Sequence, residues 1–334
     1  MKSFPRTVAW LFCSAFGGFS LCAQTPPAAT PAPIAADATP VAPADVTPPP
    51  AASPSPEEQA AAKKAVVLAE ASEALGLVSA AESGDRSQSS RLAALVDALR
   101  ANPDVPEYDR YVLVARTTAL TMKPVAKDRA AKFAAYADLA RKLIAEFPNQ
   151  AEPYASLLAL AEDSPAMGAA GQLAIELMDS KAPDTIKAAA SRILDREAMV
   201  GTPLDLPATD GKGQPLTLAQ FRGKVVVLYT WTGRINGSAD WVQRMLAQGN
   251  AQVVFVGLNL DSDTGAAQAQ LAKVAPNSIQ IYDPTGPDGP VAASLHLTRC
   301  PSVYLLDRNG ILQDVHGLDQ FDAKLTKLLG VAHP

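Results

Sequence analysis

The spacing of apolar residues divides the chain into two regions with different secondary structure. From Glu57 to about Met199, apolar residues recur at intervals of three and four, as in Leu92, Leu95 and Leu99, which is the period of amphipathic helices. Glycine is sparse inside these periodic segments, and proline and glycine mark the breaks between them. The pattern therefore predicts an all-helical domain over residues 57–199, with helices over residues 108–120, 127–147, 153–161, 167–178 and 185–199.

Beyond Gly201, short runs rich in β-branched residues replace the helical period. Strands are predicted over residues 225–229, 253–260, 279–282, 302–306 and 311–315, and helices over residues 238–248, 264–274, 289–297 and 320–329. Strands that alternate with helices indicate a mainly parallel sheet. The turn Asp307-Arg308-Asn309-Gly310 adds an antiparallel hairpin at one side. Residues 200–334 are thus predicted to form an α/β domain.

The helical domain contains one hint of a repeat. Phe147-Pro148 followed by Pro153-Tyr154 resembles the helix-pair chemistry of tetratricopeptide arrays. No clear 34-residue period recurs, so we favour an irregular helical bundle and leave the array as the alternative. Either packing would offer a groove to a partner.

The first 23 residues have the layout of a secretory signal. Lys2 and Arg6 precede an apolar run that continues to Leu21, and small Ala23 is followed by polar Gln24. We expect an exported protein, periplasmic or secreted, cleaved after Ala23. An uncleaved anchor, or a lipid anchor at Cys22, are the alternatives, and either would make the N-terminal segment the only membrane contact. Nothing later in the chain is long and apolar enough for a second span.

Residues 24–56 form a low-complexity segment with 11 prolines and 10 alanines. Proline removes amide donors and fixes φ, so this segment favours polyproline II and cannot pack as a core. We interpret it as a disordered linker between the signal and the helical domain.

Composition excludes several functions. Of 334 residues, 29 are Lys or Arg and 34 are Asp or Glu, so the chain lacks the basic excess that nucleic-acid binding requires. Three cysteines and three scattered histidines exclude a disulfide scaffold and make a metal site improbable. No cofactor is expected. Loss of the signal removes Cys13 and Cys22, which leaves Cys300 as the single thiol of the mature protein.

The C-terminal region resembles the periplasmic thioredoxin-like proteins of the TlpA and ResA type, which belong to the redoxin superfamily together with the peroxiredoxins. The similarity rests on the runs at residues 201–206, 210–212, 223–231, 259–261 and 299–310, in order and correctly spaced. It covers about residues 201–330 and implies a thioredoxin-like fold. The resemblance also implies thiol-disulfide oxidoreductase activity and a role in cell redox homeostasis, but fold alone does not carry an activity.

The residues that perform this family's chemistry are absent. The resemblance places Cys-x-x-Cys shortly after Trp231, at a helix N-terminus that stabilises a thiolate. Aligned without gaps, Ile235 and Ser238 take the two cysteine positions, and neither can exchange electrons as a thiol does. The peroxiredoxin pattern Thr-x-x-Cys fails as well, because Thr232 is again followed by Ile235. No shift of the alignment helps, since no cysteine lies between Cys22 and Cys300.

Pro301 matches the family's cis-proline, which the resemblance places beside the start of the active-site helix, where it positions a peptide. Cys300 immediately precedes it, and three interpretations stay open. It is a small packing residue, a functional thiol that forms mixed disulfides or binds a ligand, or half of an intermolecular disulfide. We favour the first.

Other side chains near the expected groove are weaker candidates. Trp231 and Trp241 are interpreted as core or groove-floor aromatics, with ligand stacking as the alternative. Arg234 is interpreted as solvated, although it could hold an anion at the following helix N-terminus. Asp261 and Asp263, two carboxylates at a strand end, indicate the start of a helix or turn more than a metal site. His296 and His316 are expected at the surface or in packing.

These observations favour a redox-inactive thioredoxin-domain protein that binds or scaffolds a protein or peptide partner. Binding would use Trp231, Thr232, Arg234 and Pro301, or the helical domain. The alternative is a thiol-disulfide oxidoreductase that works through Cys300, so whether the chain is an enzyme stays open at this stage. In a third hypothesis, the thioredoxin-like part only stabilises a helical domain that does the binding.

Overall fold

The structure is a computed structural model that describes residues 55–122, 129–164, 168–211, 213–233, 238–265, 268–269, 279–283, 285–286, 289–318 and 320–330. The predicted signal (1–23), almost all of the predicted linker (24–56) and most of the predicted helix 264–274 lie outside these residues. The chain divides into two compact units at Thr121, and each is described by itself. No helix within the described ranges is long and apolar enough to cross a membrane.

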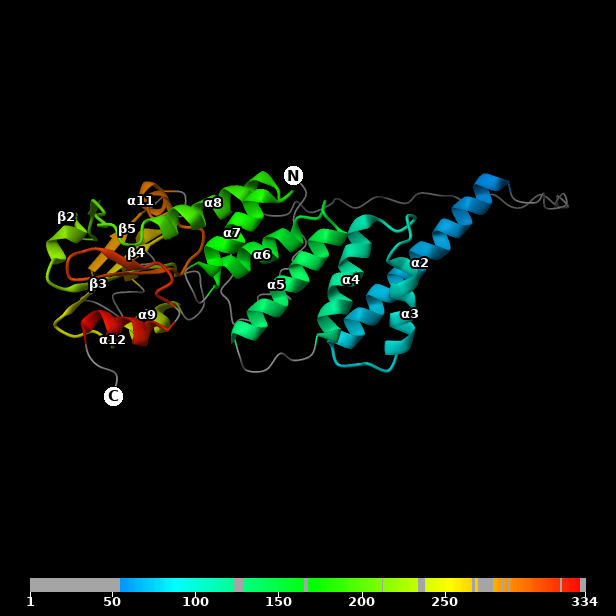
Figure 1. Cartoon of the computed structure of the whole chain (residues 1–334), viewed down its shortest axis with the longest axis horizontal. Helices are drawn as coiled ribbons and strands as arrows, with labels where there is room; N and C mark the ends of the chain where they lie inside the picture. Colours follow the sequence, from blue (N-terminus) through cyan, green and yellow to red (C-terminus); the bar gives the residue numbers. More distant parts are fainter. Residues whose placement is uncertain are drawn as a thin grey trace, which may run out of the picture. The chain divides into compact units, whose positions relative to one another are not determined.

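The unit before Met122 is helical, with helices α2 (Pro56–Glu82), α3 (Ser89–Leu99) and α4 (Glu107–Thr121) (Figure 1). Helix α2 begins at the last residue of the predicted linker, because Ser55 and Glu58 form a capping box. The Ser55 amide donates to Glu58 Oε2 (2.7 Å), and the Glu58 amide donates to Ser55 Oγ (3.2 Å). The core of this unit contains Ala74, Val78, Leu99, Val105 and Leu113.

The second unit begins with four helices: α5 (Arg129–Glu146), α6 (Glu152–Glu162), α7 (Ala169–Asp179) and α8 (Asp184–Ala198). The predicted helices are confirmed to within two residues at each end. Neighbouring helices pack on one another in chain order, and α6 also packs on α8. Buried Tyr154, in the first turn of α6, donates its hydroxyl to Pro148 O (3.0 Å). This bond fixes the Phe147-Pro148 turn between α5 and α6.

A five-stranded mixed sheet follows in the same unit. Its strands are β3 (Val225–Trp231), β4 (Val253–Asn259), β5 (Ile279–Tyr282), β6 (Val303–Leu306) and β7 (Leu312–Asp314), in the order β5-β4-β3-β6-β7. Strands β3, β4 and β5 are parallel, whereas β6 and β7 run antiparallel to their neighbours. Both the parallel core and the antiparallel hairpin are therefore confirmed. A short hairpin, β1 (Ala208–Thr209) with β2 (Pro215–Leu216), precedes the sheet.

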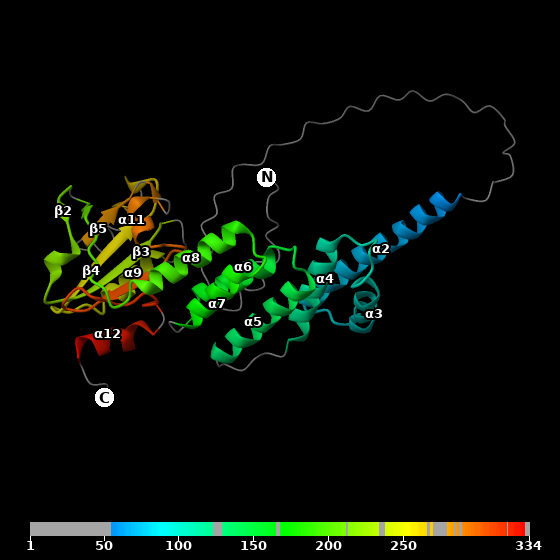
Figure 2. The ribbon, with the colours of Figure 1, turned by 45° about the horizontal axis from the view of Figure 1, so that its top comes forward.

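Alternate residues of β3 supply two hydrophobic cores, one on each face of the sheet. Val225, Val227, Tyr229 and Trp231 pack with α9 (Ser238–Leu246) and α12 (Phe321–Leu329). Val226 and Leu228 pack on the other face, with α11 (Pro290–Ser294) and the 3₁₀ turn Leu218–Phe221. In Figure 2 and in the view before it, α12 lies below the sheet and α11 above it.

The peptide bond between Cys300 and Pro301 is cis and lies just before β6. A central strand with parallel neighbours on one side, an antiparallel hairpin on the other and a cis-proline before that hairpin define the thioredoxin-like fold. The fold class predicted for the C-terminal region is thus confirmed, together with the helices that precede it.

Candidate functional site

The loop around cis-Pro301 is held against the end of strand β3. The Ser302 amide donates a hydrogen bond to Thr230 Oγ1 (2.8 Å), and the Thr230 amide donates to Ser302 O (2.9 Å). The Thr230 hydroxyl in turn donates to Cys300 Sγ at 3.7 Å. Cys300 is only 8% exposed and packs in the core that lies on the α11 face of the sheet. Its thiol is therefore a buried side chain.

The structure describes only part of the segment to which the family resemblance assigns the Cys-x-x-Cys positions. Arg234 and Ile235 lie outside the described residues, so their predicted roles stay predictions. Ser238 is the first residue of α9, and nothing is described of its side chain. Trp241 lies in the same helix, again without a described side chain.

Thr232 belongs to a buried network at the ends of strands β3 and β4. The Asp261 carboxylate accepts hydrogen bonds from Thr232 Oγ1 (2.6 Å), from the Gly233 amide (2.7 Å) and from Asn259 Nδ2 (2.8 Å). Thr232 and Asp261 are both buried. Asp261 thus anchors the backbone that leaves β3 toward the lost cysteine positions. In the described part of the chain, no three His, Cys, Asp or Glu residues gather as metal ligands would.

Trp231 lies in the core and is fixed by a second buried network. Its indole Nε1 donates to Gln280 Oε1 (2.9 Å), and Gln280 Nε2 donates to the Tyr229 hydroxyl (2.7 Å). Burial raises the pKa of Tyr229 well above its usual range, although the Gln280 bond lowers it in part, so the phenol stays protonated. Gly257 on β4 makes room for Gln280, because a Cβ there would collide with that side chain.

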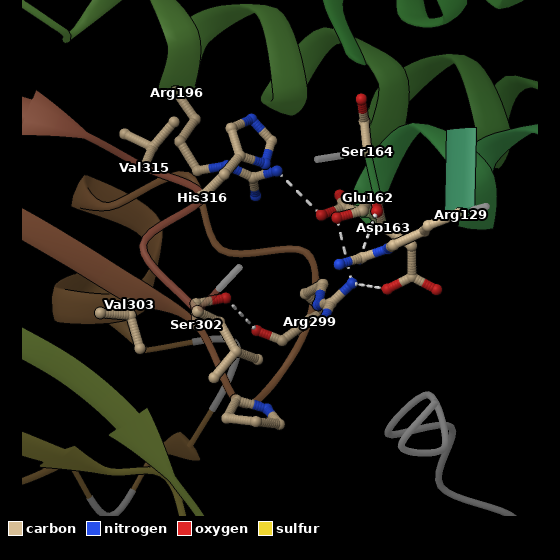
Figure 3. A pocket seen from close by; sticks show the side chains of 12 residues that line it. Arg129, Glu162, Asp163, Ser164, Arg196, Arg299, Ser302, Val303, Val315 and His316 are labelled. Atoms are coloured by element: carbon tan, nitrogen blue, oxygen red, sulfur yellow. Dashed lines mark hydrogen bonds and ion pairs between the residues drawn. The ribbon is translucent and has the colours of Figure 1, made fainter. Parts of the chain in front are cut away.

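A cavity of about 140 Å³ opens beside Pro301, between the loop and the ends of α5, α6 and α8 (Figure 3). Its apolar lining comes from Pro301, Val303, Val315 and Leu318. Its charged and polar lining consists of Arg129, Glu162, Asp163, Ser164, Arg196, Arg299, Ser302 and His316. The cavity therefore has one helical wall and one wall from the thioredoxin-like sheet.

A buried ion pair lies where the helices and the thioredoxin-like sheet meet beside this cavity; this region is called the junction below. Arg196 Nη2 on α8 donates to Glu162 Oε2 on α6 (2.8 Å), and the two side chains are only 3% and 10% exposed. Burial disfavours the charged form of Arg196, but Glu162, Tyr304 and Glu197 together outweigh this and raise the pKa of the guanidinium. Arg299 Nη1 donates to Glu162 O (3.0 Å) and also pairs with the Asp163 carboxylate.

His316 is a buried histidine at the same junction. Its Nε2 lies 3.3 Å from Glu197 Oε1, and its amide donates to Asp314 Oδ1 (2.7 Å). Burial and then the nearby Arg196 charge lower the pKa of His316, against the opposing effects of Glu197 and Asp314. His296 is partly exposed, and its Nδ1 lies 3.8 Å from Asp195 Oδ2. Both positions agree with the expectation from the sequence, which was a surface or packing role for each histidine.

Glu162, Arg196 and Arg299 are not among the candidate site residues that the sequence indicates. These residues occur in ordinary helical and loop segments, and no spacing motif joins them. Glu162 and Thr298, for example, are separated by 136 positions. One indirect signal could have indicated them as site residues: Glu162 and Arg196 are charged residues close to the ends of two helices that precede the α/β domain.

The strand order and the cis-proline loop define a thioredoxin-like domain. No protein-family model matches the chain, and no curated protein matches it. A secreted disulfide oxidoreductase of Mycobacterium tuberculosis is 25% identical, with a TM-score of 0.31, and the match covers 36% of this chain and 94% of that one.

Two Bacteroides proteins are similar in the same way. The thioredoxin domain of a thiol-disulfide oxidoreductase from Bacteroides vulgatus is 16% identical, with a TM-score of 0.33, and the match covers 39% of this chain and 97% of that one. A thiol-disulfide oxidoreductase from Bacteroides fragilis is 20% identical, with a TM-score of 0.32, and the match covers 37% of this chain and 97% of that one. The fold assignment itself rests on the strand order and cis-Pro301.

Proposed function

We propose that this chain is an exported, redox-inactive protein of the thioredoxin-like fold that binds a protein or peptide partner. The observation that carries the proposal is the distribution of sulfur, because no cysteine lies between Cys22 and Cys300. Dithiol exchange needs a thiolate that attacks and a second thiol that resolves the mixed disulfide. Ile235 and Ser238, at the positions where the family has these thiols, offer neither.

The surface beside Pro301 supports the binding role. Its cavity of about 140 Å³ is smaller than the roughly 300–1,000 Å³ of pockets that enclose a drug-sized ligand. It is suited to a single group that protrudes from a larger partner, because apolar side chains and partly exposed charged groups line it together. The Arg299–Asp163 pair, with side chains 27% and 28% exposed, offers both signs of charge at its rim.

Export rests on the N-terminal sequence and on one of the similar structures. The positive, apolar and small-residue order of residues 1–23 is that of a cleaved secretory signal. The similar Mycobacterium tuberculosis oxidoreductase is described as secreted. Detection of the chain in the periplasmic or culture fraction, with its mature N-terminus at Gln24, would support export, and a cytoplasmic chain with an intact N-terminus would contradict it.

One observation favours a second function. The Thr230 hydroxyl donates to Cys300 Sγ, and such a bond stabilises a thiolate relative to a thiol. In that alternative, the Cys300 thiolate attacks a partner's disulfide, an S–S bond forms to one sulfur and the other leaves as a thiolate. An external thiol must then release Cys300, since the mature chain has no second cysteine. The burial of Cys300 weighs against this route.

Reduction of insulin by the purified chain, with dithiothreitol as the electron donor, separates the two functions. The binding function predicts no turnover above buffer, both for the parent chain and for Cys300→Ser. Turnover that Cys300→Ser abolishes would overturn it in favour of the single-thiol oxidoreductase. Capture of partners from the exported fraction, with and without reductant, supplies the second measurement. Partners that are retained under reduction support binding through the groove or the helices, and partners lost under reduction support Cys300.

A further inference from the structure

We propose that Glu162 and Arg196 position the cis-Pro301 loop (residues 296–302), so that helices α6 and α8 set the shape of the cavity beside Pro301. The proposal extends the proposed function, because this cavity is where the partner would bind. The positioning itself is a property of the chain without a partner and is tested without one.

The loop is tied to the helices through Thr298. Arg196 Nη1 donates to Thr298 Oγ1 (2.8 Å) and to His296 O (3.3 Å), while Arg196 Nη2 holds Glu162. The Thr298 hydroxyl also hydrogen-bonds to Glu162. Figure 3 shows the Arg196 and Glu162 side chains pointing toward each other across this junction. Glu162, Arg196 and Thr298 thus form a closed triangle, with one member on each of α6, α8 and the loop.

Arg299 adds a second tie immediately before Cys300. Its Nη1 donates to Glu162 O (3.0 Å) and pairs with Asp163, at the C-terminal end of α6. On the other side of Pro301, Ser302 is bonded to Thr230 of β3. The cis-proline is therefore fixed at both ends, by the helices before it and by the sheet after it.

The burial of the Arg196–Glu162 ion pair decides how strongly helices α6 and α8 hold the loop. When one partner of a buried ion pair is removed, the other is left as an uncompensated charge in a medium that solvates it poorly. The Arg196–Glu162 pair is of this kind. The Arg141–Glu176 pair also joins two helices of this unit, α5 and α7, but its side chains are 44% and 37% exposed, so water replaces either partner.

The Cys300 thiol is a built-in reporter of the loop. It lies between Arg299 and Pro301 and is buried, so a reagent reaches it only when the loop opens or the whole domain unfolds. Alkylation by iodoacetamide, followed by mass spectrometry of the peptide that carries Cys300, measures this opening in the full chain without interference from Cys13 and Cys22. Urea unfolding of the same variants gives the contribution from global unfolding.

The experiment compares Glu162→Gln and Thr298→Val with the matched control Glu176→Gln. Thr298→Val keeps the side-chain shape but removes the hydroxyl that joins Arg196 and Glu162, so it stays informative if Glu162→Gln fails to fold. We expect Cys300 alkylation in Thr298→Val to rise about tenfold, as the loss of a charge-assisted hydrogen bond would produce. This rise should exceed the change in the global unfolding constant. Glu176→Gln should stay within about twofold of the parent.

The proposal is overturned if Thr298→Val alkylates at the parental rate, or if its rise equals the rise in global unfolding. An equal acceleration in Glu176→Gln would also overturn it, because the loop would then respond to any weakening of the helices. None of these outcomes depends on a partner. Absence of partner binding would therefore contradict the proposed function without affecting this result.

Discussion

The hydroxyl oxygen of Thr230 accepts a hydrogen bond from the Ser302 amide at 2.8 Å, across the cis-proline loop. The same hydroxyl lies 3.7 Å from Cys300 Sγ, so a single side chain of the central strand contacts the residues on both sides of Pro301. Thr230 is fully buried. The Thr230 hydroxyl therefore adds a buried side-chain contact to the backbone hydrogen bond from the Thr230 amide to Ser302 O, which also holds the loop against β3.

Thr230→Val tests this side-chain contact. Valine keeps the shape of threonine but leaves the buried Ser302 amide without its acceptor, which costs about 1–3 kcal/mol of unfolding free energy. Urea unfolding measures this loss. Thr326→Val removes a hydroxyl that donates to Asp322 O in an exposed bond within helix α12, and its unfolding free energy should change by no more than about 0.5 kcal/mol. Equal losses in the two variants would contradict the special role of Thr230.

Gln280→Leu tests the network around Trp231. The substitution keeps the volume roughly constant but leaves both Trp231 Nε1 and the Tyr229 hydroxyl without the hydrogen bonds to Gln280. We expect a loss of about 2 kcal/mol or more in unfolding free energy, with a change in tryptophan emission. The control Gln313→Leu loses only an exposed bond to Asp307, and its stability should stay close to that of the parent. A Gln280→Leu protein as stable as this control would refute the prediction.

The low pKa of His316 predicts that the protein loses stability in mild acid. In the folded chain the group titrates below its ordinary value of 6.5, so as the pH falls below about 6.5 the unfolded chain binds a proton before the folded chain does. The unfolding free energy should therefore be highest above that pH and decline as the pH drops toward 5.

Urea midpoints at pH 7.5, 6.5, 5.5 and about 5 measure the decline. His316→Gln should flatten it, because the neutral amide keeps a polar contact near Glu197 but does not titrate. Arg196 on α8 and Lys324 on α12, which donates to His316 O, remain in place in this variant. His296→Gln, at a partly exposed position, is the comparison, and an equally flattened slope there would count against His316 as the source.

The Arg196–Glu162 and Arg141–Glu176 ion pairs should differ sharply in their effect on stability. Arg196→Met leaves Glu162 as a buried carboxylate without its ion pair, and we expect a loss of about 3–5 kcal/mol. Arg141→Met breaks a half-exposed pair and should cost no more than about 1 kcal/mol. Thermal or urea unfolding of both proteins gives the comparison, and similar losses would show that burial does not decide the strength of these pairs.

Most secondary structure was predictable because its signals are local. The run Val225–Tyr229 is β-branched and closed by Gly223 in front, and it forms the central strand. The helices of residues 129–198 begin and end within two residues of their predicted bounds, since proline and glycine lie at the breaks. Helix α2 begins one residue before the predicted start of the helical region at residue 57, because Ser55 and Glu58 form a capping box at the end of the proline-rich segment.

The candidate site was predictable only where it follows the chain. The cis bond before Pro301 was anticipated from the family resemblance and is confirmed. Asp261 was expected at the start of a helix or turn, and the structure adds that its carboxylate accepts hydrogen bonds from Thr232 and Gly233, 28 or more positions away. The pairing register of β3 and β4 decides which residues at their ends lie side by side, and the sequence of one strand alone does not specify that register.

By itself, the sequence determined that no cysteine lies between Cys22 and Cys300, so this segment holds no thiol in any fold. It also determined the order of helices and strands along the chain, because the spacing of apolar residues that marks each element repeats every two to four residues and is contained in a single segment. Only the tertiary structure decided that Glu162, Arg196 and Thr298 meet at the cis-proline loop and that the Cys300 thiol is buried. Such contacts join distant positions of the chain, and they exist only once the helices and the sheet have packed together.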